Sequence, residues 1–262
     1  MPGEGGEAHA TGFADALLSH DVFLGGKLAV WQPLHGYRAA TDPVLLAAAV
    51  TARPGQSVLE LGCGAGVALL ALGRRVAGLT LHGIERQADY AALARRNAAE
   101  NRIAAGIATA DLAAMPAALR AQRFDHVLAN PPYYPPRAPA ARDPGRAAAL
   151  REQTPLASWI EAGLRRLVDG GYLTMIHRAE RLPAILAGLE GRAGDVAVRP
   201  LAGRAGREAG RVLVRARKGA RGPFRLLAPL VLHDGPAHDG DGDDFTRAAQ
   251  VILREGAALD WG

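Results

Sequence analysis

The sequence has little of several features, and each shortage excludes a class of protein. It has one cysteine in 262 residues, which excludes a disulfide framework or cysteine-rich zinc site and fits a reducing compartment. Its N-terminus lacks the basic, apolar and small-residue progression of a secretory signal. Its longest apolar run, 43–50, is far shorter than the roughly 20 residues of a membrane span. We therefore expect a cytoplasmic protein without a membrane partner, and no metal because the histidines lack ligand spacing.

Lysine is also scarce, so the positive charge is almost entirely arginine. Lys27 and Lys218 are the only lysines, while the formal net charge is +5. Ten of the basic residues fall within 192–225. Clustered arginine suits phosphate, because the planar guanidinium can donate two parallel hydrogen bonds. A nucleic-acid footprint and a merely solvated, arginine-rich face both explain this cluster, and the sequence leaves both open.

From residue 56 onwards, strand-like runs alternate with helical runs. The expected strands are 56–61, 79–84, 103–110, 124–129 and 172–177, and the expected helices are 66–76, 87–101, 155–168 and 181–189. Strands separated by helices indicate parallel βαβ units. We expect an α/β fold with a doubly wound, mostly parallel sheet of seven strands. A short connection between 195–201 and 211–217 predicts an antiparallel pair at the sheet edge.

The two ends of the chain have a different pattern. We expect a loose tail over 1–20, a hairpin and helix over 21–55, and one main domain over 56–262. Gly25 and Gly26 predict the hairpin turn, and Asp42 before a proline predicts a helix start with Asp42 as the N-cap.

A glycine-rich turn follows the first strand of the main domain. Gly62, Gly64 and Gly66 alternate with other residues between this strand and its helix. Ligands of open α/β sheets bind at the carboxyl ends of strands, and glycine allows positive φ and close approach of a ligand. A tight strand–helix connection and a dinucleotide site are the alternatives. The dinucleotide fingerprint requires Gly or Ala where this sequence has Val67.

Acidic residues end the next two strands. Glu85 lies 19 residues after Gly66, where a carboxylate can accept both hydroxyls of a ribose. Asp111 is placed to accept an adenine amino group. Together with the glycine turn they predict a nucleoside-bearing cofactor. Glu60 is expected either to hold an ammonium group or to be a buried carboxylate bonded to backbone donors. We expect Cys63 to fill space rather than to act as a nucleophile.

The tetrapeptide Asn130-Pro131-Pro132-Tyr133 directly follows the fourth strand. The prolines fix the backbone and remove two N–H donors, which leaves the Asn130 side-chain carbonyl and the Pro131 main-chain carbonyl as acceptors. Two acceptors suit a planar NH2 group, and Tyr133 offers a face on which a base can stack. A plain Asn-Pro turn is the alternative, but two motifs at neighbouring strand ends favour a functional site.

With these motifs the sequence resembles class I S-adenosylmethionine-dependent methyltransferases of the Asn-Pro-Pro-Tyr type, which methylate amino groups. The resemblance covers about residues 56–178 and implies a Rossmann-like methyltransferase fold with S-adenosyl-L-methionine as cofactor. It implies that the cofactor binds at the strand ends and the glycine turn, namely Glu60, Gly62, Gly64, Gly66, Glu85, Asp111 and Asn130. It also implies that Asn130, Pro131 and Tyr133 hold the target amino group.

A narrower resemblance extends to both ends of the chain. The segments 23–28, 32–33, 36–38 and 41–46 look like the lead-in of bacterial tRNA adenine-N6 methyltransferases that act on valine tRNA, and 211–219 and 229–233 look like their C-terminal part. This resemblance implies that the lead-in is a lid over the cofactor, with Arg38, Thr41 and Asp42 near it. Ordinary capping and packing of the first helix is the alternative role of these three.

An RNA substrate, most simply a tRNA, requires that the target base leave its stack. We expect the flanking nucleotides to be gripped by a rim made of Pro132, Tyr134, Arg137, Arg142 and Arg146. The rival substrates are a protein glutamine amide, a guanine N2 in rRNA and an adenine in DNA. Glutamine methyltransferases usually carry a helical substrate domain before the core, for which the roughly 55 preceding residues leave little room. A cofactor-binding module without activity would not need Asn130 or Tyr133.

Overall fold

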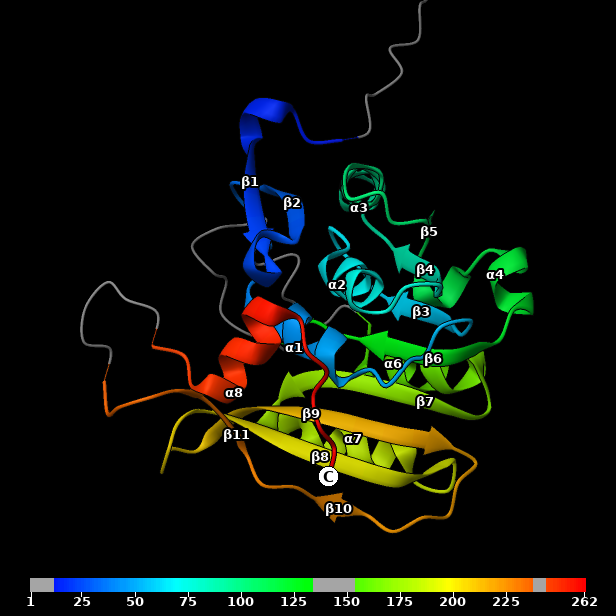
Figure 1. The fold of residues 1–262 in the computed structure, drawn as a ribbon. Coiled ribbons are helices and arrows are strands. Elements are labelled where there is room, and N and C mark those ends of the chain that lie inside the picture. The colour runs from blue at the N-terminus through cyan, green and yellow to red at the C-terminus, as the bar shows by residue number, and fades with distance from the viewer. Residues whose placement is uncertain (1–11, 134–153, 238–243) are drawn as a thin grey trace, which may run out of the picture.

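The computed structural model describes residues 12–133, 154–237 and 244–262 (Figure 1). Within these residues there are two sheets: a hairpin of β1 (Leu18–Phe23) and β2 (Leu28–Pro33), and a larger sheet of nine strands. The strands of this large sheet are β3 (Ser57–Leu61), β4 (Thr80–Glu85), β5 (Ala105–Thr109), β6 (Phe124–Ala129), β7 (Leu167–Arg178), β8 (Ala193–Arg204), β9 (Ala209–Lys218), β10 (Arg225–Leu226) and β11 (Leu230–His233).

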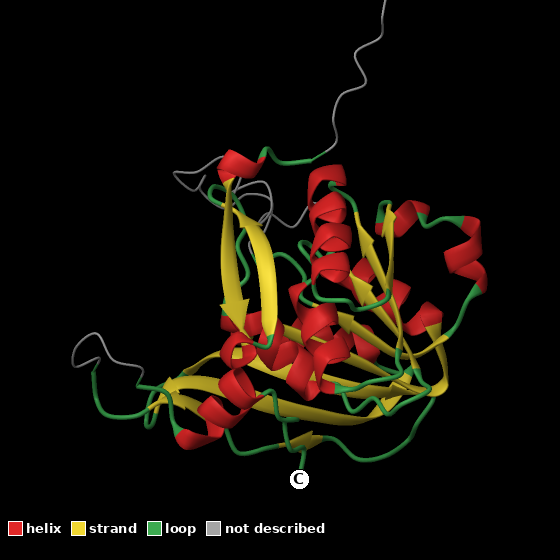
Figure 2. Ribbon diagram, turned by 45° about the horizontal axis from the view of Figure 1, so that its top comes forward, coloured by secondary structure: helices red, strands yellow, loops and turns green. Residues whose placement is uncertain are grey.

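Helices cover both faces of the large sheet (Figure 2). They are α1 (Thr41–Ala49), α2 (Val67–Arg75), α3 (Ala88–Glu100), α4 (Ala117–Ala121), α6 (Leu156–Arg166), α7 (Leu182–Leu189) and α8 (Arg247–Gln250). Side chains of α1, α2 and α3 share one apolar core with the hairpin and the C-terminal residues. Side chains of α4, α6 and α7 form the core on the opposite face. The doubly wound α/β arrangement is therefore confirmed.

The strand order is β10-β8-β9-β7-β6-β3-β4-β5. Strands β3 to β7 pair in parallel, and β9 is antiparallel to both β7 and β8. The antiparallel pair was predicted, but the prediction of seven strands was wrong. The apolar run 224–233 forms two further strands, β10 and β11, which both pair in parallel with β8. Pro229 has no N–H to donate, which suits the break between these two strands.

Two details of the lead-in also differ from the prediction. β1 begins at Leu18, paired with Pro33, so the hairpin starts before residue 21. Helix α1 begins at Thr41, and Asp42 is not its N-cap. The Asp42 carboxylate is used in contacts with other segments, described below.

Asn97 of α3 and Asn101, the residue directly after this helix, dock the hairpin onto the main domain. Asn101 accepts from the Ala29 N–H at 3.0 Å and donates to the Ala29 carbonyl at 2.6 Å. Asn97 likewise accepts from the Trp31 N–H at 2.8 Å and donates to the Trp31 carbonyl at 3.1 Å. It also donates to the Ala65 carbonyl at 2.9 Å. Asn97 and Asn101 are four residues apart and therefore lie on the same side of the helix. Ala29 and Trp31 are two residues apart, so their backbone groups point to the same edge of β2. The two side-chain amides thus make the hydrogen bonds that a neighbouring strand would make. The lead-in is thereby joined to the glycine-rich turn.

We predict that buried His126 makes the protein less stable in mild acid. His126 is 2% exposed, bonds Gln56 at 3.1 Å and stacks on Tyr172. Burial, with a smaller contribution from nearby arginines, lowers its pKa to about 4. Because the unfolded histidine titrates near its ordinary 6.5, the free energy of unfolding should be fully retained above that pH. It should fall by about 1.4 kcal/mol per pH unit as pH drops towards 4.

Urea unfolding at pH 7.5, 6.0 and 5.0 measures this dependence. The variant His126→Gln keeps a polar partner for Gln56. Its free energy of unfolding should lack the part of the pH dependence that His126 causes. An equal slope in the variant would mean that other groups cause it.

Candidate functional site

The carboxyl ends of β3, β4, β5 and β6 open into one pocket. It encloses about 1070 Å³ when the open space at its entrance is included. Seven residues predicted from the sequence line it, namely Glu60, Gly62, Gly64, Glu85, Asp111, Asn130 and Pro132. The structure thus brings the glycine turn, the acidic strand ends and the Asn-Pro-Pro-Tyr turn to one cavity.

The glycines of the turn between β3 and α2 all adopt positive φ, as the pattern predicted. Their φ values are +65° at Gly62, +52° at Gly64 and +88° at Gly66. A Cβ at Gly62 would lie 2.5 Å from the ring of Trp159 in α6. Any side chain there would push this ring, so Gly62 is needed for packing as well as for the turn.

Glu85 closes the turn from the end of β4. One of its oxygens accepts the Gly64 N–H at 2.9 Å, and the other accepts the Gln87 N–H at 2.9 Å. The residue is 8% exposed and lines the pocket. A carboxylate has about four lone-pair sites, so each oxygen retains one for a ligand hydroxyl.

Glu60 lies deeper, on β3. It is 3% exposed, and one oxygen accepts the Leu69 N–H at 2.9 Å in the first turn of α2. Burial raises its pKa well above the ordinary value, and the Leu69 hydrogen bond only partly opposes this. A cationic ligand group in the pocket would stabilise its charged form. Both roles expected for Glu60 are compatible with this geometry.

Cys63 packs inside the turn. It is buried, and burial raises its pKa well above the ordinary value. A Cβ at Gly83 would lie only 2.9 Å from its sulfur, so the thiol fills the space beside a strand glycine. A protonated, buried thiol is a poor nucleophile, which favours the space-filling role.

Asp111 starts a short 3₁₀ turn, Leu112–Ala114, after β5. It caps this turn by accepting the Ala113 N–H at 2.8 Å, and Arg86 lies 3.9 Å from its other oxygen. Asp111 and Leu112 both line the pocket. A polar group and an apolar side chain therefore face the same end of the cavity.

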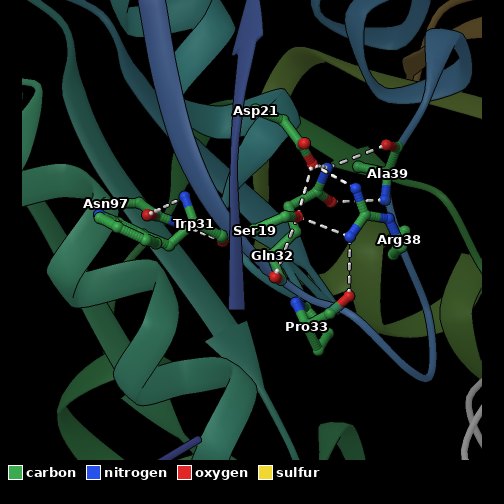
Figure 3. A network of polar contacts seen from close by, with 8 residues as sticks. All are labelled: Ser19, Asp21, Trp31, Gln32, Pro33, Arg38, Ala39 and Asn97. Atoms are coloured by element: carbon green, nitrogen blue, oxygen red, sulfur yellow. Dashed lines mark hydrogen bonds and ion pairs between the residues drawn. The ribbon is translucent and has the colours of Figure 1, made fainter. Parts of the chain in front are cut away.

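The segment 33–40 joins β2 to α1 and is fastened to the hairpin by Arg38 (Figure 3). The Arg38 guanidinium donates to Ser19 Oγ at 2.6 Å and to the Asp21 carboxylate at 2.7 Å. It also donates to the Pro33 carbonyl at 3.0 Å. The side chain thus faces the hairpin, and neither Arg38 nor Thr41 is among the residues that line the pocket.

The same segment supplies pocket residues that the sequence analysis missed. The Gln32 amide pairs with the backbone of Ala39, at 2.7 and 3.2 Å (Figure 3). The Tyr90 hydroxyl of α3 accepts the Tyr37 N–H at 2.9 Å and donates to the Tyr37 carbonyl at 3.0 Å. Gln32, Tyr37, Ala39 and Tyr90 all line the pocket. Nothing local in the sequence marks them, because their partners lie on other elements.

Asn130, which lines this pocket, is in contact with Tyr133. The Tyr133 hydroxyl lies 2.7 Å from Asn130 Oδ1 and 2.6 Å from a carboxylate oxygen of Asp42. Asn130 Nδ2 lies 3.3 Å from the Tyr37 hydroxyl. The polar contacts of the Asn130 side chain are therefore two hydroxyls, those of Tyr37 and Tyr133. Burial, with Asp42 as the next cause, raises the pKa of Tyr133 far above its ordinary value.

Arg211 of β9 completes this group. Its Nε donates to the same Asp42 oxygen at 2.6 Å, and its guanidinium lies over the Tyr133 ring at 4.9 Å from the centroid. His177, at the end of β7, meets that ring edge-on at 5.4 Å. The sequence analysis missed Arg211 and His177 because they lie far from the motif in the chain.

Four predicted residues, Tyr134, Arg137, Arg142 and Arg146, lie outside the described residues. The arginine cluster of 192–225 is described, and most of it is engaged with the protein itself. Eight of its ten basic residues contact carbonyls, carboxylates or aromatic rings of the chain, namely Arg192, Arg199, Arg204, Arg211, Arg215, Arg217, Lys218 and Arg225. This use favours a structural role for most of the cluster.

In the described parts of the chain, no helix is both long enough and apolar enough to span a bilayer. In the same residues, no three or more His, Cys, Asp or Glu side chains are grouped so that they could hold a metal ion.

Comparison with known proteins identifies the family. The model of the methyltransferase small domain matches residues 40–189. Curated relatives named tRNA1(Val) (adenine(37)-N6)-methyltransferase include one from Actinobacillus succinogenes, 29% identical over 55% of this chain and 62% of that protein. Another, from Porphyromonas gingivalis, is 31% identical over 62% and 67%, and one from Dickeya chrysanthemi is 29% identical over 83% and 87%. The chain thus spans less than two thirds of the first of these relatives.

Solved structures agree with this assignment. A predicted O-methyltransferase from Agrobacterium tumefaciens superposes with a TM-score of 0.68, at 28% identity over 83% of this chain and 98% of that chain. A T. thermophilus 16S rRNA methyltransferase in complex with AdoMet and guanosine, 18% identical, has a TM-score of 0.55 over 77% and 50% and shows the fold alone. The chain, whose pocket lies at the strand ends, belongs to the methyltransferase small domain family.

Proposed function

We propose that this protein is an S-adenosylmethionine-dependent methyltransferase that acts on the N6 amino group of an adenine in tRNA, and that it works in the cytoplasm. The observation that carries the proposal is that Asn130, which lines the pocket directly after β6, is in contact with Tyr133. The names of the curated relatives support the choice of an adenine and of tRNA.

The pocket residues fit S-adenosyl-L-methionine, which supplies a methyl group activated by a sulfonium. The spare lone pairs of Glu85 suit the ribose hydroxyls, and Asp111 beside Leu112 suits the adenine. Glu60 suits the ammonium group, because its buried carboxylate gains a cation there. Gly62, Gly64 and Gly66 let the backbone approach the ligand. We propose these residues as the cofactor site.

In the reaction we propose, Asn130 Oδ1 and the Pro131 carbonyl accept hydrogen bonds from the two N–H groups of the target amine. This orients the nitrogen lone pair towards the methyl carbon, and Tyr133 stacks on the base. A nitrogen–carbon bond forms as the sulfur–carbon bond breaks, the electron pair stays on sulfur, and the nitrogen then loses a proton to water. Positioning supplies most of the rate enhancement, so the site needs no strong base.

For the RNA partner we propose contacts mainly around the pocket mouth. Pro132 lies there, and Tyr134, Arg137, Arg142 and Arg146 follow it in the sequence. The internal use of most arginines in 192–225 supports this choice over the cluster itself. We also propose that the hairpin and α1, together with Arg38, Thr41 and Asp42, act as a lid.

Nucleoside analysis tests the substrate. The purified protein, incubated with labelled S-adenosylmethionine and separately with total tRNA, rRNA, DNA or cell protein, should label tRNA. The digested tRNA should contain N6-methyladenine as the labelled nucleoside. Label found in N2-methylguanine, in DNA or in methylglutamine would replace our proposed substrate with the corresponding rival.

We predict that Asn130→Ala separates methyl transfer from cofactor binding. Loss of the side-chain acceptor should lower kcat by at least about 100-fold, because the amine is no longer oriented. The Kd for S-adenosylmethionine, measured by calorimetry, should change little. A parallel loss of cofactor affinity and of thermal stability would assign Asn130 a folding role instead.

We predict that Arg38 acts on cofactor binding through the segment 33–40. Arg38→Gln should loosen this segment and weaken cofactor binding several-fold, since Tyr37 and Ala39 line the pocket. Asp21→Asn, which removes only the partner carboxylate, should weaken it similarly. If Asp21→Asn leaves the Kd for S-adenosylmethionine unchanged while Arg38→Gln raises it, Arg38 contacts the cofactor directly.

A further inference from the structure

Asp42 joins three segments that are far apart in the sequence. Its carboxylate, at the start of α1, contacts the Tyr133 hydroxyl 91 residues away at 2.6 Å. It contacts Arg211 Nε of β9, 169 residues away, also at 2.6 Å. The Asp42 side chain is 22% exposed and the Arg211 side chain 39%. The family comparison gives this pair no role, and Asp42 is not among the pocket-lining residues.

The Tyr133 hydroxyl has one proton and two acceptors. Asp42 Oδ2 lies at 2.6 Å and Asn130 Oδ1 at 2.7 Å. A carboxylate is the stronger acceptor, because a hydrogen bond to a charged group is roughly twice as strong as a neutral one. Arg211 holds the Asp42 carboxylate in place through its ion pair. The Tyr133 hydroxyl therefore donates its hydrogen bond mainly to Asp42.

The direction of this hydrogen bond determines whether the Asn130 carbonyl is available to a ligand. When Tyr133 donates to Asp42, the Tyr133 oxygen faces Asn130 Oδ1 at 2.7 Å without a proton between them. Two acceptors at this distance repel each other. An incoming N–H donor relieves the repulsion, so the Asn130 carbonyl is prepared for an amine. If Tyr133 donated to Asn130 instead, the same carbonyl would already be engaged.

The ring of Tyr133 is held so that its hydroxyl stays between these two acceptors. The guanidinium of Arg211 lies over it, and His177 meets it at an interplanar angle of 64°. Burial lowers the pKa of His177 to about 4, so this neighbour is neutral at physiological pH. The hydroxyl itself stays protonated, since burial raises the pKa of Tyr133.

We propose that Asp42, held by Arg211, is a positioning residue of the methyl transfer: it accepts the hydrogen bond of the Tyr133 hydroxyl and thereby leaves the Asn130 carbonyl free for the target amine. The proposal rests on the function proposed above, because it concerns the amine acceptor of that reaction. In this proposal Asp42 determines the hydrogen bonding of Asn130 and does not bind the cofactor.

A double-mutant cycle tests the proposal. Asp42→Asn should lower kcat about tenfold with little change in KM for tRNA, since a neutral amide lets Tyr133 donate to Asn130. Tyr133→Phe should lower kcat a few-fold, because the ring loses its anchor. Adding Asp42→Asn to Tyr133→Phe should lower kcat no further, because no hydroxyl is left to compete for Asn130. An equal loss from Asp42→Asn in both backgrounds, or no loss in either, overturns the proposal.

Asp244→Asn is the matched control. Asp244 pairs with Arg204 at 2.5 Å, and both side chains are partly buried, at the end of β8. This variant removes a similar carboxylate from a similar ion pair away from Tyr133. Its effect on kcat should be small and the same with and without Tyr133→Phe, which separates loss of an ion pair from loss of hydrogen-bond control.

A second measurement needs no substrate and separates this proposal from the proposed function. In 15N-labelled protein, the side-chain NH2 signal of Asn130 is assigned by its loss in Asn130→Ala. Asp42→Asn should shift that signal, and adding Asp42→Asn to Tyr133→Phe should not. Equal shifts in both backgrounds overturn the proposal. If the unchanged protein does not methylate tRNA, the proposed substrate fails, and this measurement still decides the role of Asp42.

Discussion

The site depends on hydrogen bonds by which Asn97 and Asn101 hold the lead-in against the main domain. A two-stranded hairpin is marginally stable on its own, so its position must come from contacts with another element. The two amides bind the backbone of β2 like a third strand, and Asn97 also binds the carbonyl of Ala65 in the glycine-rich turn. The side of α3 that supports the glycine-rich turn therefore also positions one wall of the pocket, which includes Gln32 and Tyr37.

The parts of the site on the main sheet could be predicted from the sequence, because they follow a topological rule. In a parallel sheet all carboxyl ends meet at one edge, so Gly62, Glu85, Asp111 and Asn130 converge once the strands before them are recognised. The doubly wound fold followed from the same alternation of strands and helices. The strand count did not, since β10 and β11 pair with β8 and their short runs have no helix between them to mark a βαβ unit.

What the sequence did not predict depends on contacts between distant segments. The Asp42–Arg211 pair joins residues 169 positions apart, and no local pattern distinguishes Asp42 as a helix cap from Asp42 as an ion-pair partner. Trp159 and Tyr90 look like ordinary core aromatics until the fold brings them beside Gly62 and Tyr37. Arg38 was predicted beside the cofactor, and its guanidinium instead faces Ser19 and Asp21.

The arginines of 192–225 show why net charge is weak evidence for a partner. A guanidinium has five N–H donors and a flat face, so it can satisfy carbonyls and stack on aromatic rings inside a fold. Arg199 and Arg225 bind carbonyls near the C-terminal residues, and Arg215 lies over Trp261 at 4.7 Å. These side chains bind residues 260–262 and are not free for phosphates. The case for an RNA substrate therefore depends on the amine-binding turn and on the relatives, not on the positive charge of the chain.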